Sequence, residues 1–198
     1  MHYEEVLGYW FGEEEASAAY QKEKSALWFG GAPSTDHEIR EKFTALVEEA
    51  AAGHLRDWEQ RPRSALALVI LLDQFPLNIY RDKARSYELC DLALPIALRA
   101  IDRHFDDELT PTEASFLYLP LEHAEDLALQ ERCVKLYAAL LERTEGEFWR
   151  KWIQGNYDYA VRHLKVVEQF GRFPHRNEAL GRTSTPAELA FLAKGRPF

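Results

Sequence analysis

The chain is poor in cysteine, in clustered positive charge and in long hydrophobic runs. Two cysteines in 198 residues are too few for a disulfide framework, and their helix-like surroundings are typical of reduced core thiols. No five basic residues cluster, and 24 basic against 33 acidic residues give a net charge of −9, which disfavours nucleic-acid binding. The longest apolar run, residues 65–72, is far shorter than the roughly 20 residues that span a bilayer.

Familiar catalytic and nucleotide-binding motifs are also missing. The sequence contains neither GxGxxG nor a Walker A loop, and it contains no HExxH, no paired Glu-x-x-His and no GxSxG. Two isolated cysteines do not form a zinc site by themselves. We therefore predict no cofactor and no metal of these kinds, while other enzyme chemistry stays open.

Composition and the N-terminal sequence together indicate a globular intracellular protein. The first ten residues, MHYEEVLGYW, are acidic and aromatic, so we expect no signal peptide, a cytoplasmic location and no membrane association. Hydrophobic residues make up 46% of the chain and charged residues 29%, which suits a packed core. The length suits a single domain over residues 1–198.

What the sequence does contain is helical periodicity over nearly its whole length. Apolar residues recur at helical spacing, and no run of 4–8 residues shows convincing strand alternation. The pattern predicts an all-α fold of antiparallel helical hairpins. Because two loose sequence echoes do not form a regular repeat, we expect an irregular stack rather than a regular solenoid.

Local signals predict where several helices begin and end. A second helix is expected from about residue 13 to residue 28, and one of about residues 87–104 follows a connector. The spacings of Thr35 to Glu38 and of Thr110 to Glu113 predict capping boxes. Pro76 is expected to end the central helix, which is apolar nearly all round.

A carboxylate at the end of this central helix needs an explanation. Asp73 follows eight apolar residues, and a buried carboxylate requires a cation or several donors, or its pKa rises. In a structural interpretation, Asp73 forms an ion pair with Arg81 or Arg172, or it caps the turn at Pro76. In a functional interpretation, the central helix positions Asp73 toward a ligand.

Acidic residues surround one imidazole in the segment 119–132. His123 and Asp126 are three residues apart and share a face if the segment is helical. A neighbouring carboxylate would then raise the pKa of His123 and orient its ring for acid–base chemistry. The alternative is a solvated helix end, in which Asp126 or Glu125 lies at the N-terminus of the next helix.

The segment 170–182 concentrates positive charge in a loop with glycine and proline. Arg172, His175, Arg176 and Asn177 lie within six residues. Arginine forks match carboxylate and phosphate groups, and His175 and backbone N–H groups would add donors. The alternative is a structural clamp, in which the two arginines neutralise Asp73 and the acidic residues of segment 119–132.

One further histidine and a tryptophan pair lie on predicted helices. His163 lies two turns before Phe170, a setting more typical of a satisfied core histidine than of a ligand. A metal site of His123, His163 and an acid is a weaker hypothesis. Trp149 and Trp152 are one turn apart and are expected to anchor the core, while exposed aromatic surface leaves a homodimer open.

Four segments taken together resemble one bacterial family. They are VLGYWFG, LALVILLDQFPLNIYR, FLYLPLEHAEDLALQE and FGRFPHRNEALGRTSTPAELAFL, and they extend over about residues 6–192. The chain resembles the family named domain of unknown function 924. The resemblance implies a tetratricopeptide-like arrangement of helical hairpins and carries over no catalytic residues. Leu77 stands where it implies an arginine, which leaves Arg81 as the local cation.

The leading hypothesis is a polar pocket that binds a small anionic ligand. Arg172 and Arg176 would hold the anion, and His123 or His175 would act as a general acid or base if the protein is an enzyme. The complete set of candidate site residues is Asp73, His123, Asp126, His163, Arg172, His175, Arg176 and Asn177. The alternative is a protein-interaction module that binds a partner in an apolar groove with lysine or arginine.

Overall fold

A computed structural model describes residues 2–195, and this part of the chain is all-α, as predicted, with no β-strand. A π-helical turn (Ile70–Gln74) joins α4 to α5, and short 3-10 turns lie at Arg56–Gln60, Phe105–Asp107 and Pro174–Arg176. No described helix is both long and apolar enough to cross a membrane. The α-helices are α1 (Tyr3–Trp10), α2 (Ala18–Phe29), α3 (Pro33–Ala51), α4 (Pro62–Val69), α5 (Phe75–Ile79), α6 (Ala84–Asp102), α7 (Pro111–Glu122), α8 (Leu127–Arg143), α9 (Glu147–Phe170) and α10 (Pro186–Leu192).

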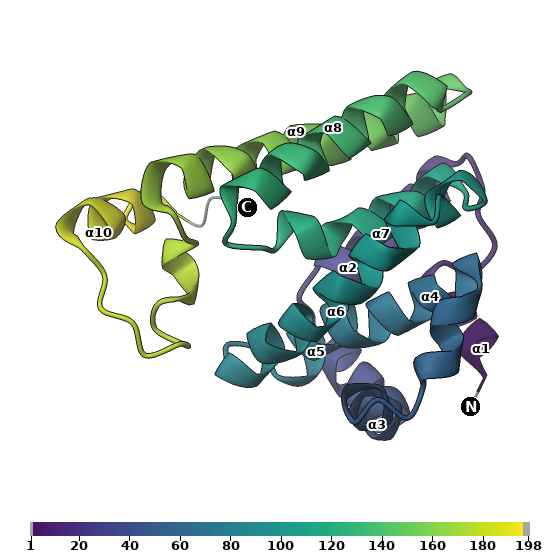
Figure 1. The fold of residues 1–198 in the computed structure, drawn as a ribbon, viewed down its shortest axis with the longest axis horizontal. Helices are drawn as coiled ribbons and strands as arrows, with labels where there is room; N and C mark the ends of the chain where they lie inside the picture. The colour runs from purple at the N-terminus through teal and green to yellow at the C-terminus, as the bar shows by residue number, and fades with distance from the viewer. Residues whose placement is uncertain (1, 196–198) are drawn as a thin grey trace.

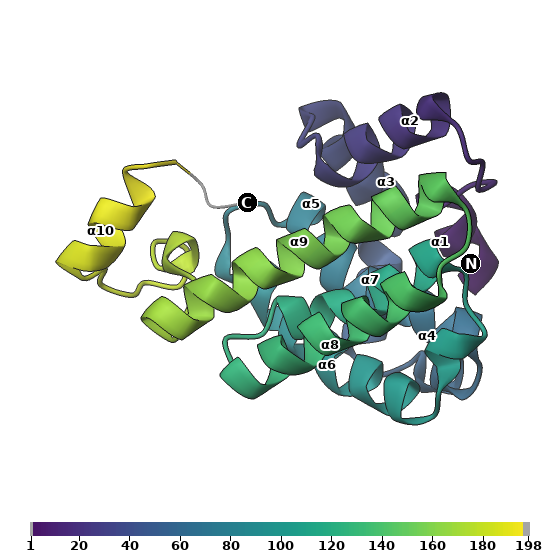
Figure 2. The ribbon, with the colours of Figure 1, turned by 90° about the horizontal axis from the view of Figure 1, so that it is seen from above.

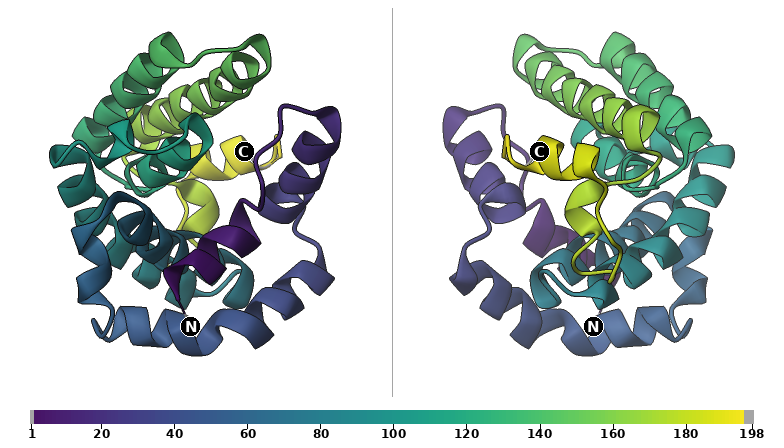
Figure 3. Two further views of the ribbon diagram at one scale, coloured as in Figure 1. Left: turned by 90° about the vertical axis from the view of Figure 1, so that its right-hand side faces the viewer. Right: turned by 90° about the vertical axis from the view of Figure 1, so that its left-hand side faces the viewer.

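From α5 to α9, helices that follow one another in the chain pack as neighbours. The pairs α6–α7, α7–α8 and α8–α9 are in contact, and α8 and α9 form a long antiparallel hairpin (Figure 1). Viewed end-on, the helices form a curved layer with α2 and α3 at one end and α8 and α9 at the other (Figure 3). The C-terminal loop and α10 extend beyond the end of α9 (Figure 2).

The core surrounds the central helix that the sequence predicted. Residues 65–72 are all buried, because α4 and the π turn pack against α6, α7 and α1. An aromatic cluster lies beside them, with ring centroids 4.7 Å apart for Trp28 and Phe116 and 5.6 Å apart for Trp28 and Trp152. Cys90 and Cys133 are buried free thiols, which confirms the prediction for both cysteines.

The prediction that Pro76 ends the central helix is wrong. The chain continues helically to Ile79, because the backbone widens into the π turn immediately before the proline. The N–H of Phe75 bonds to the carbonyl of Ile70, five residues back. In an α-helix, a proline lacks the N–H for the helical hydrogen bond, and its ring clashes with the carbonyl four residues before it. The wider π turn accommodates the proline. Asp73 lies within the π turn.

One of the two predicted capping boxes is present. The Thr110 side chain accepts from the N–H of Glu113, and the Glu113 carboxylate accepts from the N–H of Thr110. The box predicted for Thr35 is wrong, because α3 begins at Pro33 and places Thr35 inside the first turn.

Two helix starts also differ from the predictions. Helix α2 begins at Ala18 rather than near residue 13, because the Ser17 side chain caps it by accepting from the N–H of Tyr20. Helix α6 begins at Ala84 rather than near residue 87. In both cases the apolar pattern identified the helix but not its first turn.

Candidate functional site

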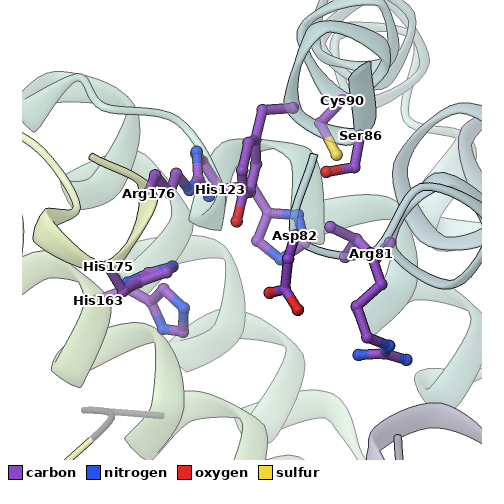
Figure 4. A pocket seen from close by; sticks show the side chains of 10 residues that line it. Arg81, Asp82, Ser86, Cys90, His123, His163, His175 and Arg176 are labelled. Atoms are coloured by element: carbon purple, nitrogen blue, oxygen red, sulfur yellow. The ribbon is translucent and has the colours of Figure 1, made fainter. Parts of the chain in front are cut away.

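Two neighbouring cavities share Leu77 and Arg81 in their walls. The smaller one, called the polar cavity below, has a volume of about 210 Å³. The larger one, called the aromatic cavity, has a volume of about 670 Å³. Figure 4 shows the polar cavity, which is lined by Leu77, Arg81, Asp82, Ser86, Tyr87, Cys90, His123, His163, His175 and Arg176.

The π turn and the end of α7 bring Asp73 and His123 together. Asp73 is fully buried, and its Oδ1 lies 2.8 Å from Nδ1 of His123. The Gln74 side chain donates to the other carboxylate oxygen at 2.5 Å. A carboxylate accepts at both oxygens, so the contact with Asp73 fixes the imidazole ring and selects Nδ1 as its donor. His123 lines the polar cavity and has a buried carboxylate behind it.

A second histidine–carboxylate contact lies beside the first. Nδ1 of His163 is 3.0 Å from the carbonyl oxygen of Tyr159 and 3.1 Å from Oε1 of Glu122. Burial raises the pKa of Glu122 to about 8, with a further contribution from the charge of Asp73. Burial lowers the pKa of His163 to about 3. At neutral pH the contact therefore joins a neutral imidazole to a largely protonated carboxyl group.

Arg176 brings a buried positive charge to the wall of the polar cavity. Only 9% of the residue is exposed, and its guanidinium lies over the rings of Tyr87 and Phe173 at 4.9 and 4.5 Å. Its Nη1 donates to the carbonyl of His123 at 2.9 Å, but its buried Nε has no hydrogen-bond partner. Burial lowers the pKa of Arg176. Across residues 2–195, no carboxylate lies within ion-pair distance of this guanidinium.

Arg172 does not reach the cavity, in contrast to the hypothesis that it holds an anion there. It forms a two-pronged ion pair with Glu188, with its Nε 2.6 Å and its Nη2 2.9 Å from the carboxylate oxygens. In segment 119–132, Glu125 forms an ion pair with Arg182. The Nη1 and Nη2 atoms of Arg182 donate to the two carboxylate oxygens of Glu125 at 2.5 and 2.9 Å. The loop thus contains structural clamps, formed by Arg172 and by an arginine that the sequence analysis did not single out.

Two other candidate residues also have structural roles outside the cavity. Asp126 does not face His123, because the chain turns between α7 and α8, and its side chain caps α8 by accepting from the N–H of Leu129 at 3.0 Å. Asn177 is buried and donates to Ser184 Oγ at 3.0 Å. Five of the eight candidates therefore gather at the polar cavity: Asp73, His123, His163, His175 and Arg176.

Arg81 is not the partner of Asp73 that the sequence suggested. Its Nε and Nη2 bind the two carboxylate oxygens of Asp36 at 2.6 and 2.7 Å. This pairing lowers the pKa of Asp36. The remaining guanidinium nitrogen, Nη1, makes no hydrogen bond with the part of the chain described, and Arg81 lines both cavities.

One group of side chains could offer ligands to a metal ion. Atoms of Asp73, Cys90 and His123 lie within 4.8 Å of one another, and His163 is not part of this group. Cys90 Sγ contacts the backbone carbonyl of Asp73 at 3.3 Å, and burial raises the thiol pKa well above its usual value. A cation here would break the His123–Asp73 hydrogen bond and would lie near the Arg176 charge. The donor set therefore favours the hydrogen-bonded arrangement over a metal centre.

Comparisons with known proteins confirm the resemblance found in the sequence. The family described as "bacterial protein of unknown function (DUF924)" matches residues 6–196. The chain belongs to this family. The chain is also similar to a solved structure titled as a protein of unknown function, ATU0120, from Agrobacterium tumefaciens. The two are 33% identical, with a TM-score of 0.80, and the match covers 98% of this chain and 97% of that chain. None of the curated proteins matches this chain.

Several residues at the cavity of this DUF924 protein were missed by the sequence analysis. Tyr87 and Cys90 lie on α6, and their only signal was a helical pattern that predicts burial. Glu122 was noted only as one of several acidic residues, although it is 4% exposed. Its place directly after the apolar segment of residues 116–121 is the signal that distinguishes it from the exposed Asp126.

The capping role of Asp126 is directly testable. Asp126→Ala is expected to lower the free energy of unfolding by about 1 kcal/mol, because the N–H of Leu129 loses its acceptor. Asp126→Ser keeps an acceptor and is the matched control. Urea denaturation of the three proteins measures the difference, and an unchanged midpoint for Asp126→Ala would show that the cap contributes nothing.

Proposed function

We propose that the polar cavity binds a small ligand carrying a carboxylate or phosphate group, with Arg176 as its main anchor. The supporting observation is the guanidinium of Arg176, which is buried without an ion pair from residues 2–195 and has an unpartnered Nε. A buried charge without a partner is costly, and its retention is expected where a ligand supplies the missing acceptor. Carboxylate and phosphate groups match the guanidinium fork.

Two further side chains support an anion in this cavity. Nη1 of Arg81 is available as a second donor on the wall that both cavities share. His123, held by Asp73 from behind, would act as the acid or base toward a bound ligand. Asp82 lines the same cavity and repels an anion from its own side, so the anion is expected on the side of Arg176.

We propose that the stack of α6 to α9 corresponds to tetratricopeptide-like hairpins, supported by the contacts between successive helices. A fold of this kind often presents a groove to partner proteins. The aromatic cavity, with its apolar wall and Lys151, favours such a partner as the second candidate function, but it does not account for the buried charge of Arg176.

The test compares anion binding by the parent and by Arg176→Met. Inorganic phosphate and acetate are titrated separately, with binding followed by NMR chemical shifts of the histidine rings. We expect saturable shifts in the parent and at least a tenfold weaker affinity in Arg176→Met, since a hydrogen bond to a charged group contributes about 1.5–3 kcal/mol. Equal affinity in the two proteins, or no saturable shift in the parent, would overturn the proposal.

The matched control removes the same charge elsewhere. Arg132 lies on α8, lines neither cavity and pairs with Asp102 at 2.6 Å. Arg132→Met changes the net charge as Arg176→Met does, so it is expected to bind both anions as the parent does. A matching loss of affinity in Arg132→Met would assign the effect to net charge.

A further inference from the structure

The aromatic cavity has the size and the walls of a small-molecule site. It lies among α2, the π turn, α5, α7 and α9, and its volume of about 670 Å³ is in the range of ligand pockets, roughly 300–1,000 Å³. Figure 2 shows α9 passing between α8 on one side and α2 on the other. The apolar part of its wall consists of Trp28, Phe29, Leu77, Phe116, Leu119 and Trp152.

Gly155 gives this cavity space that the protein itself does not use. It lies in the middle of α9, where glycine costs about 1 kcal/mol relative to alanine. A Cβ built at Gly155 would meet no atom within 4 Å, so no packing contact requires a glycine. Gly155 is exposed to water and lines the aromatic cavity, so its missing side chain leaves this part of the cavity wall open.

The two cavities adjoin each other and share part of one wall. Leu77 and Arg81 belong to both walls. The walls also meet at the contact of 3.1 Å between Glu122, which lines the aromatic cavity, and His163, which lines the polar cavity. A ligand with its charged group at Arg176 therefore has an adjoining apolar space for the rest of the molecule.

The rim of the aromatic cavity also exposes large aromatic side chains to water. Phe29 is 68% exposed and Tyr159 is 46% exposed, and both line the cavity. Covering such surface with an apolar ligand group is favourable in proportion to the area removed from water. The two adjoining cavities thus differ in chemistry: hydrogen-bond donors line the polar cavity, and aromatic rings line the aromatic cavity.

We propose that the ligand of this protein is an amphipathic anion, with its carboxylate or phosphate group on Arg176 in the polar cavity and its acyl or aryl part in the aromatic cavity. This inference rests on the proposed function, because it assigns the charged end of the ligand to the same site. It adds the class of ligand and assigns a second site, lined by Trp28, Trp152 and Gly155, to its hydrophobic part.

The test is a series of straight-chain carboxylates from acetate to decanoate, together with the corresponding alkyl phosphates, titrated by calorimetry. We expect affinity to rise about two- to fourfold for each added methylene that becomes buried. The carboxylate and phosphate arms identify which headgroup the polar cavity prefers. An affinity that does not change with chain length would overturn the inference, while Arg176-dependent binding of phosphate and acetate would leave the proposed function intact.

Gly155→Leu tests whether the chain enters the aromatic cavity. The leucine fills the open space, so we expect acetate to bind as in the parent and decanoate to bind no more tightly than acetate. Gly8 lies on the exposed side of α1, lines neither cavity, and also has no atom within 4 Å of a built Cβ. Gly8→Leu is therefore the matched control and is expected to keep the full chain-length dependence.

The outcomes separate the two proposals. Chain-length dependence that persists in Gly155→Leu would place the hydrophobic part elsewhere and overturn this inference. Decanol is the uncharged probe. If decanol binds in a Gly155-dependent way while no anion shows Arg176-dependent binding, both the proposed function and the amphipathic anion are overturned. The aromatic cavity is then a site for an uncharged ligand.

Discussion

Glu122→Gln is expected to remove the destabilising contribution that Glu122 makes to the parent as the pH rises from 4.5 to 8. Glu122 has a pKa of about 8 in the folded protein against an ordinary value of 4.5, because the carboxyl is buried and lies near the charge of Asp73. The fold thus favours the protonated form. Its contribution to stability is complete below pH 4.5 and is lost progressively as the pH rises through 8, by roughly 5 kcal/mol in total.

His163 produces the opposite slope. Burial lowers its pKa from 6.5 to about 3, so the folded state favours the neutral imidazole. This contribution to stability is complete above pH 6.5 and is lost as the pH falls toward 3. Between pH 4.5 and 6.5 the two slopes cancel, and we expect the contribution of the pair to be nearly flat there and to decline on both sides.

Urea denaturation at a series of pH values measures this profile. Glu122→Gln keeps the shape of the side chain and removes its titration, so its free energy of unfolding is expected to exceed that of the parent increasingly from pH 4.5 to 8. The control is Glu131→Gln, which changes an exposed carboxylate on α8. Parallel profiles for the parent and Glu122→Gln would contradict the raised pKa.

The sequence was informative wherever burial alone decides the structure. Residues 65–72 were predicted to form the buried centre because every one of them is apolar, and all of them are buried. Asp73 was recognised as a buried carboxylate that needs partners, and it has two. Hydrophobic periodicity carries this information because it depends only on the spacing of residues along one element.

Partners across the fold could not be predicted in the same way. Asp73 binds His123, 50 positions later, whereas Arg81, only eight positions away, binds Asp36 instead. Asp73 lies in the π turn, and no spacing rule in the sequence specifies a π turn before Pro76. Closeness in the sequence therefore gave the wrong partner for Asp73, which binds His123, and for Arg81, which binds Asp36.

The loop 170–182 shows why residue type alone does not identify a binding residue. Arg172, Arg176 and Arg182 lie in one loop, and each has a different environment. Two of them hold carboxylates, Glu188 and Glu125, and the third lies between aromatic rings at a cavity. Only their positions in three dimensions distinguish the two clamps from the candidate anion-binding residue.

Arg182→Met is expected to destabilise the protein by about 3 kcal/mol, while the same change at Arg176 alters stability by less than about 1 kcal/mol. Burial alone would raise the pKa of Glu125, but Arg182 and the N–H of Phe173 hold it below its usual value. Arg182→Met leaves this half-buried carboxylate without its cation and removes a donor from the carbonyl of Phe173.

Arg176→Met removes fewer stabilising interactions than Arg182→Met does. The variant loses one hydrogen bond to the carbonyl of His123 but no ion pair with the described chain, and it no longer buries a charge. A methionine keeps an apolar stem against Tyr87 and Phe173, whose rings the guanidinium now covers. The loss of the hydrogen bond and the relief of the buried charge are therefore expected to offset each other.

Thermal unfolding of the two variants, which carry the same substitution six positions apart, separates a binding residue from a clamp. For a chain of 198 residues, 3 kcal/mol corresponds to a fall in the unfolding midpoint of roughly 6–12 °C for Arg182→Met. For Arg176→Met the midpoint is expected to stay within about 4 °C of the parent. If Arg176→Met falls as far as Arg182→Met, Arg176 is a structural residue, and the anion site loses the observation that supports it.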